Sequence, residues 1–150
     1  MEENNKSTWA EEMFKIAQNN NSMEKRARNW LKRNLIKEID PLRNKIHAEA
    51  YKGNTSVRCV FNTRFTRKDF NEEEIEEKEN DIISVLEEHS KDFLNCDKET
   101  KLEMFTETYQ ELIKQYGLKI EEPKILESIF KIPTNDVEIE YIISWDFSNN

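Results

Sequence analysis

The carboxylate pair near the C-terminus is the first candidate for chemistry in this sequence. Glu138 and Glu140 alternate in a segment with the period of a strand, so both side chains would lie on one face, about 7 Å apart. Two carboxylates at such a distance could hold a divalent ion or carry out acid–base catalysis. A chain with 31 Asp and Glu residues also places such pairs on its surface by composition alone. We therefore expect these two residues to be surface charges.

Histidine and cysteine residues offer the other possible centre. The sequence holds two of each, namely His47, His89, Cys59 and Cys96. No spacing among them is typical of a metal site, and none places a histidine as the partner of a nucleophilic cysteine. The chain has only two glycines, too few for a phosphate-binding loop. We therefore expect no enzyme activity, no bound metal and no cofactor.

The strongest strand pattern positions the carboxylate pair. Residues 137–147 alternate six apolar side chains with mostly polar ones, so a strand would place all six on one face. Residues 56–65 alternate in the same way and carry Arg58 and Arg64 on the polar face. Pairing of the two strands would bring these arginines beside the carboxylates and align the apolar faces. Because two strands make a weak sheet, we expect a third strand or strand pairing between copies.

Helices are expected to make up most of the fold. A capping box predicts a helix start at Thr8, and an apolar stripe with helical spacing then runs over residues 23–50. The polar run Asn19 to Ser22 predicts a kink or break in this long N-terminal helix, and Pro41 predicts a second one. Three further helices are expected, at 72–94, 98–116 and 123–131. The predicted class is α+β, mostly helical with a small antiparallel sheet, in a single domain over 1–150.

Charge is divided unevenly along the chain. The formal net charge is −8, but residues 1–70 carry +6 and residues 71–150 carry −14. Such an asymmetry indicates a charged partner, although two solvated faces of one small protein would also produce it. We place the partner-binding set at the acidic start of the 72–94 helix: Glu72, Glu73, Glu74, Glu76, Glu77 and Glu79. Tyr109 and Tyr116 are the candidate aromatic anchors.

Positive charge gathers on the outer face of the helix expected over residues 24–45. The candidates for an alternative nucleic-acid face are Lys25, Arg26, Arg28, Lys32, Arg33 and Lys37. Lysine and arginine bind phosphates without sequence preference, so such a face would bind plain DNA or RNA. Trp30 falls beside the apolar stripe, which favours a core position for this ring and a solvated face for the charges.

Size, composition and the absence of catalytic motifs resemble those of small acidic accessory proteins of phages and mobile elements, among them the anti-CRISPR proteins. The resemblance covers size and composition, not alignable residues. It implies an inhibitor that docks its acidic C-terminal part on a basic surface of a nucleic-acid-handling protein. A nucleic-acid-binding protein using the basic helix, and an oligomeric structural or assembly protein, are the alternatives.

The apolar segments of the chain are short. The first 25 residues are polar and charged, and no apolar run reaches 18 residues, so we expect a cytoplasmic protein without a membrane partner. The alanine, leucine and isoleucine stripe of the N-terminal helix would suit an intermolecular helical bundle. A homodimer is therefore a further expectation.

Overall fold

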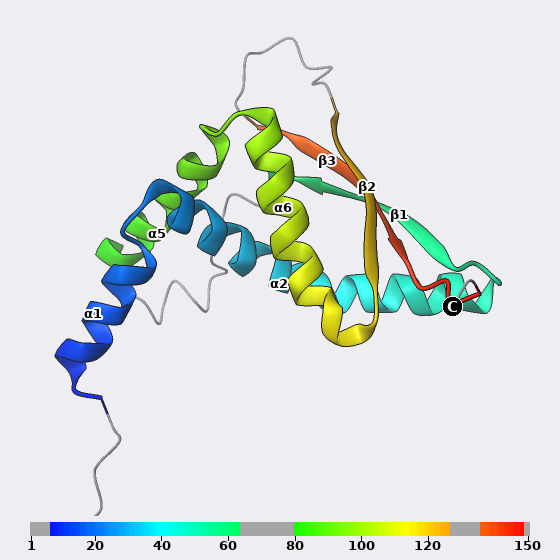
Figure 1. Ribbon diagram of the computed structural model, residues 1–150, viewed down its shortest axis with the longest axis horizontal. Coiled ribbons are helices and arrows are strands. Elements are labelled where there is room, and N and C mark those ends of the chain that lie inside the picture. Colours follow the sequence, from blue (N-terminus) through cyan, green and yellow to red (C-terminus); the bar gives the residue numbers. More distant parts are fainter. Residues whose placement is uncertain (1–6, 64–79, 127–135, 149–150) are drawn as a thin grey trace, which may run out of the picture.

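The computed structural model describes residues 7–63, 80–126 and 136–148 of the 150-residue chain. Within these residues, four α-helices and a three-stranded antiparallel sheet form a mostly helical α+β fold, as predicted (Figure 1). In chain order the elements are α1 (Trp9–Asn19), α2 (Met23–Tyr51), β1 (Ser56–Asn62), α5 (Asn80–Leu94), α6 (Lys98–Ile113), the 3-10 turn η1 (Lys114–Tyr116), β2 (Lys119–Leu126) and β3 (Glu138–Ser144).

Short polar side chains and one glycine set the ends of the helices. The Thr8 hydroxyl accepts a hydrogen bond from the Glu11 backbone N–H at 3.1 Å, and α1 begins at the next residue. Asp97 accepts in the same way from the Thr100 N–H at 2.7 Å, at the start of α6. Gly117 follows η1 with a φ of +71°, the left-handed conformation that commonly ends a helix. These boundaries follow from local sequence.

The long N-terminal helix is broken once rather than twice. Residues 20–22 turn the chain between α1 and α2, and the Ser22 hydroxyl caps α2 by accepting from the Lys25 N–H at 3.1 Å. Helix α2 then continues through Pro41 for 29 residues, a length of about 43 Å. Pro41 removes one helical N–H donor, but this part of the helix surface is exposed, so water can reach the carbonyl that loses its partner.

The sheet has the strand order β1–β3–β2, so the most regular strand of the sequence is the central one. Antiparallel pairing aligns Cys59 with Tyr141, and the inward residues of both strands are buried. On the outer face the Glu140 carboxylate pairs with Arg58 and with Lys124, each at 3.3 Å, from the two flanking strands. The predicted pairing of these strands and the contact between their opposite charges are therefore confirmed, while Arg64 lies outside the described residues.

Strand β2 shows that the helix predicted at 123–131 is wrong in its described part. These residues form an edge strand instead, and the rest of the range lies outside the described residues. The register shifts between Glu121 and Lys124, and Glu122 adopts a φ of +50°. Pro123 lies in this bulge, where an edge strand tolerates a residue without an N–H. Pairing with β3 thus outweighs the local preference of proline for a first helical turn.

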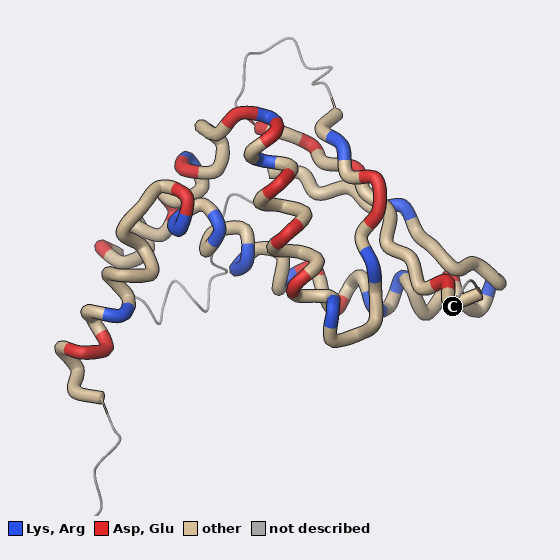
Figure 2. The backbone as a smooth tube through the Cα atoms, viewed as in Figure 1, with Lys and Arg blue, Asp and Glu red and all other residues tan. Residues whose placement is uncertain are grey.

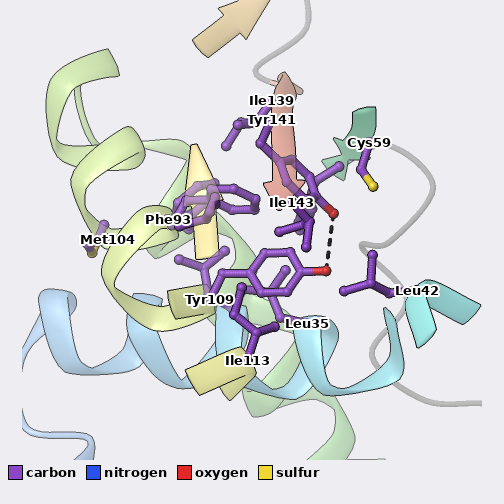
Figure 3. Packing of buried hydrophobic residues seen from close by; sticks show 14 of the residues in the cluster. Leu35, Leu42, Cys59, Phe93, Met104, Tyr109, Ile113, Ile139, Tyr141 and Ile143 are labelled. Atoms are coloured by element: carbon purple, nitrogen blue, oxygen red, sulfur yellow. Dashed lines mark hydrogen bonds between the residues drawn. The ribbon is translucent and has the colours of Figure 1, made fainter. Parts of the chain in front are cut away.

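The core lies between one face of the sheet and helices α2, α5 and α6. Aromatic rings from these elements form a row, with neighbouring centroids 5.2 to 6.3 Å apart, in the order Phe93, Trp30, Phe61, Phe105 and Tyr141. The Tyr141 and Tyr109 hydroxyls are hydrogen-bonded at 3.3 Å inside this core (Figure 3). Because each ring of this size buries a large apolar area, the row contributes strongly to the stability of the core.

Helix α1 leaves its apolar side chains exposed, whereas α2 buries its apolar stripe. The stripe of α2 lies in the core, since Ala27, Leu31 and Leu35 are fully buried, so the predicted intermolecular bundle cannot use it. Helix α1 extends away from the sheet (Figure 1) and buries no residue. Its Trp9 and Phe14 side chains are 74% and 63% exposed. Helix α1 therefore presents exposed apolar side chains with none of its residues in the core.

Candidate functional site: the charged faces of the helices

The predicted partner-binding set falls on different parts of the chain. Its six glutamates, Glu72, Glu73, Glu74, Glu76, Glu77 and Glu79, lie outside the described residues, and their role stays a prediction. Tyr109 is wrong as a surface anchor, because its ring is fully buried against Phe105 and Tyr141. Tyr116 is 40% exposed, and the Arg43 guanidinium lies over its ring at 4.9 Å from the centroid. Of the two tyrosines, only Tyr116 can meet a partner.

An acidic ridge runs down the outer face of α6. It consists of four exposed glutamates at every fourth position: Glu99, Glu103, Glu107 and Glu111. Consecutive members lie about 6 Å apart along the helix axis, because each step spans four residues of 1.5 Å rise. Figure 2 shows acidic positions recurring along the length of this helix. The opposite face of α6 holds core residues such as Met104 and Ile113, so the fold fixes the direction in which the ridge points.

A hollow of about 520 Å³ lies beside the acidic ridge, between α2 and α6. Its lining residues include Lys32, Glu107, Glu111 and Leu112. Arg28 also lines the hollow and pairs with Glu107 there, so Glu111 is the lining carboxylate that has no ion pair among the described residues, and the half-buried Leu112 adds an apolar contact beside it. Ridge and hollow together give the α6 surface both charge and shape.

The predicted nucleic-acid face on α2 is largely occupied by contacts inside the protein. Arg26 Nε lies 3.1 Å from an Asp92 carboxylate oxygen on α5. Arg28 reaches Glu107 of the acidic ridge at 2.9 Å, and it also pairs with Glu24 at 3.1 Å.

Two further members of this face are held by backbone carbonyls. Arg33 donates to the Leu86 carbonyl at 3.2 Å, and Lys25 donates to the Gln18 carbonyl at 3.0 Å. Lys32 and Lys37, the remaining two, are exposed. A nucleic acid on this face would have to displace the contacts of at least four of the six predicted residues, so the arrangement favours a structural role for them.

The other residues considered for chemistry also have structural partners. Glu138 accepts a hydrogen bond from the Asn62 amide at 2.8 Å, and Glu140 is paired with cations from both neighbouring strands. Burial raises the pKa of the Cys59 and Cys96 thiols, which disfavours the thiolate that a nucleophile needs. Over residues 7–63, 80–126 and 136–148, no three His, Cys, Asp or Glu side chains are grouped to hold a metal ion.

Sequence reasoning missed a hollow beside Trp145. This aromatic groove has among its lining residues Asp40, Arg43, Asn44, His47, Tyr116 and Trp145. The signal for its α2 side was present in the sequence, since the first four of these residues are spaced i, i+3, i+4 and i+7 and share one helix face. What lies opposite that face depends on the ends of α6 and β3, which the spacing does not reveal.

Comparison of the chain with protein-family models, with curated proteins and with solved structures gave no match. None of the described helices is both long enough and apolar enough to cross a membrane.

Proposed function

We propose that this protein is a non-catalytic binding protein, an inhibitor of the anti-CRISPR type. It docks an acidic surface on a basic surface of a nucleic-acid-handling protein. The observation that carries the proposal is the contrast between two faces. The acidic ridge of α6 points outward from the core, whereas most of the basic face of α2 is engaged inside the molecule.

The acidic ridge supplies charge that is ready for a partner. Within the described part of the chain, Glu99, Glu103 and Glu111 form no ion pair, and only Glu107 is shared with Arg28. Carboxylates held on a rigid helix need little ordering when they bind, which reduces the entropic cost of association. A field of one sign also speeds encounter with an oppositely charged surface and selects against partners of like charge. The ridge is therefore suited to a surface that otherwise binds phosphates.

Charge reversal on the ridge tests the proposal. The variant carries Glu99→Lys, Glu103→Lys and Glu111→Lys. The matched control carries Glu12→Lys, Asp81→Lys and Glu87→Lys, which alter the net charge equally at exposed positions of α1 and α5. Each tagged protein is incubated with nuclease-treated bacterial lysate at about 0.15 M salt, where longer-range charge effects are screened. Captured proteins are identified by mass spectrometry.

We expect the wild type and the control to retain the same basic nucleic-acid-binding protein, and the ridge variant to lose it. Equal retention by the ridge variant would contradict the proposal. A gel shift with plain DNA and RNA separates it from the alternative of direct nucleic-acid binding. The proposed inhibitor leaves double-stranded DNA and double-stranded RNA unshifted, because its basic face on α2 is occupied.

A further inference from the structure

The aromatic groove lies at the end of the molecule where α2, η1 and β3 meet. Its volume is about 720 Å³, and a second hollow of about 500 Å³ shares Trp145 as a common lining residue. The Trp145 backbone N–H donates to the Thr55 carbonyl at 2.9 Å, which ties this residue to the start of β1. Volumes of 300 to 1,000 Å³ are typical of small-molecule sites, so the groove has the size of a ligand site.

The α2 side of the groove presents polar groups that form no hydrogen bond or ion pair with another described residue. Over the described residues, the side chains of Asp40, Arg43, Asn44 and His47 make no hydrogen bond or ion pair. The other described arginines, Arg26, Arg28, Arg33 and Arg58, all donate to a carboxylate or a carbonyl. A free carboxylate, guanidinium, amide and imidazole therefore follow one another over about 10 Å of helix axis.

Ring faces complete the groove. The Arg43 guanidinium is held over the Tyr116 ring at 4.9 Å, a contact that uses its face and leaves its N–H donors available for an anion. His47 stacks on the exposed Tyr51 ring, with centroids 5.1 Å apart and planes at 25°. Trp145 is half-buried on the opposite side. The groove thus combines one oriented cation with the ring of Trp145.

We propose that the aromatic groove binds a nucleotide, either free or as a unit of a single strand. The Arg43 guanidinium takes the phosphate, since its planar donors match phosphate oxygens. The Asp40 carboxylate accepts from ribose hydroxyls, and the Asn44 amide matches the donor and acceptor edge of a base. The base stacks on the half-buried Trp145 ring, because every base has a flat face that an aromatic side chain can cover.

The chemistry of the groove favours this ligand over others of similar size. A peptide carboxylate would also meet Arg43, but it presents two acceptor oxygens where a phosphate monoester presents three to the guanidinium donors. A purely apolar ligand would leave Asp40 and Arg43 desolvated without partners, which is costly. A ligand with a phosphate, hydroxyls and a flat base addresses Arg43, Asp40 and Asn44 together.

The test is isothermal titration of the full chain with adenosine 5′-monophosphate, adenosine, inorganic phosphate, a single-stranded oligonucleotide and an aromatic dipeptide with a free carboxylate. We expect the monophosphate to bind. Adenosine and phosphate should each bind at least about tenfold more weakly, because each lacks some of the groups that contact the groove. If the oligonucleotide binds more tightly than the monophosphate, the natural source is a strand. If the oligonucleotide and the monophosphate bind equally tightly, the natural ligand is the free nucleotide.

The decisive variant is Arg43→Gln, with Arg58→Gln as the matched control on the outer face of the sheet, where Arg58 pairs with Glu140. We expect Arg43→Gln to weaken the binding of the monophosphate by about 10- to 100-fold, as the loss of a charge-assisted hydrogen bond predicts. We expect the control to bind the monophosphate like the wild type. The ridge variant of α6 should also bind normally, so this proposal and the proposed function can fail separately.

Three results would overturn the nucleotide proposal. They are the absence of nucleotide binding at millimolar concentration, binding that Arg43→Gln leaves unchanged, and binding of the dipeptide without the monophosphate.

Discussion

The two halves of α2 carry similar polar residues and use them in opposite ways. In the first half, residues 23–38, the arginines donate to groups on α2, α5 and α6, and the stripe beneath them is core. In the second half, residues 40–51, Arg43 and its polar neighbours face a hollow. A charged residue of α2 is thus available for binding only where the fold brings no acceptor against it.

The cause of this difference is the cover that each half receives. Helices α5 and α6 pack on α2 (Figure 1), and they bring Asp92, Leu86 and Glu107 to the arginines of the first half. Near the other end of α2 the chain returns through η1 and β3, and these leave room for the aromatic groove. A helix of one composition therefore has a structural half and a half with binding capacity.

The largest expected difference between the halves is in stability. Trp30→Ala removes a fully buried ring that stacks on Phe93, and we expect it to lower the free energy of unfolding by about 3–5 kcal/mol. His47→Ala changes an exposed residue of the second half, and we expect a change within about 0.5 kcal/mol. Urea unfolding followed by circular dichroism measures both. Similar losses in the two variants would contradict the division of α2.

A pH dependence should also arise from the core that the first half supports. Burial raises the pKa of Tyr109 and of Tyr141 far above the value of a free tyrosine, which is about 10. Above that pH the unfolded chain loses these protons while the folded protein retains them, so the free energy of unfolding falls as pH rises. Each tyrosine contributes a slope of about 1.4 kcal/mol per pH unit.

Urea unfolding between pH 9 and pH 12 measures this slope. The matched variant is Tyr109→Phe with Tyr141→Phe, which removes both ionisable hydroxyls and keeps the rings. We expect it to lose stability less steeply with pH than the wild type. An unchanged slope would show that the alkaline loss comes from other groups, such as the lysines.

The smallest expected effect compares one arginine from each half. Arg26→Gln breaks a partly buried pair with Asp92, and we expect a loss of about 1–2 kcal/mol, reduced from the full value by solvent exposure. Arg43→Gln removes only the contact with the Tyr116 ring, and we expect a loss below about 1 kcal/mol. Thermal unfolding at matched ionic strength compares the two. A larger loss from Arg43→Gln would mean that the groove arginine holds the fold together.

Much of the fold could be predicted because its signals are local. The capping side chains of Thr8 and Asp97 act within one helical turn, and Gly117 ends η1 through its own backbone conformation. The alternation in β1 and β3 sets which side chains face inward, and the charges on the outer face agree with the pairing. The candidate site was predictable only as a list of charged residues, without the partners of each.

Other features of the protein were decided by tertiary structure, because they depend on contacts between residues that are distant in the sequence. Pairing with β3 made residues 119–126 a strand, because ladder hydrogen bonds outweigh the helical preference of a single proline turn. Packing against β3 also buried Tyr109, whose helical spacing alone fits a surface or a core. The sequence by itself determined the main helices, the paired strands β1 and β3 and the sign of their charge. Only the folded chain decided which charges neutralise one another and which, around Arg43 and on the ridge of α6, remain open to a partner.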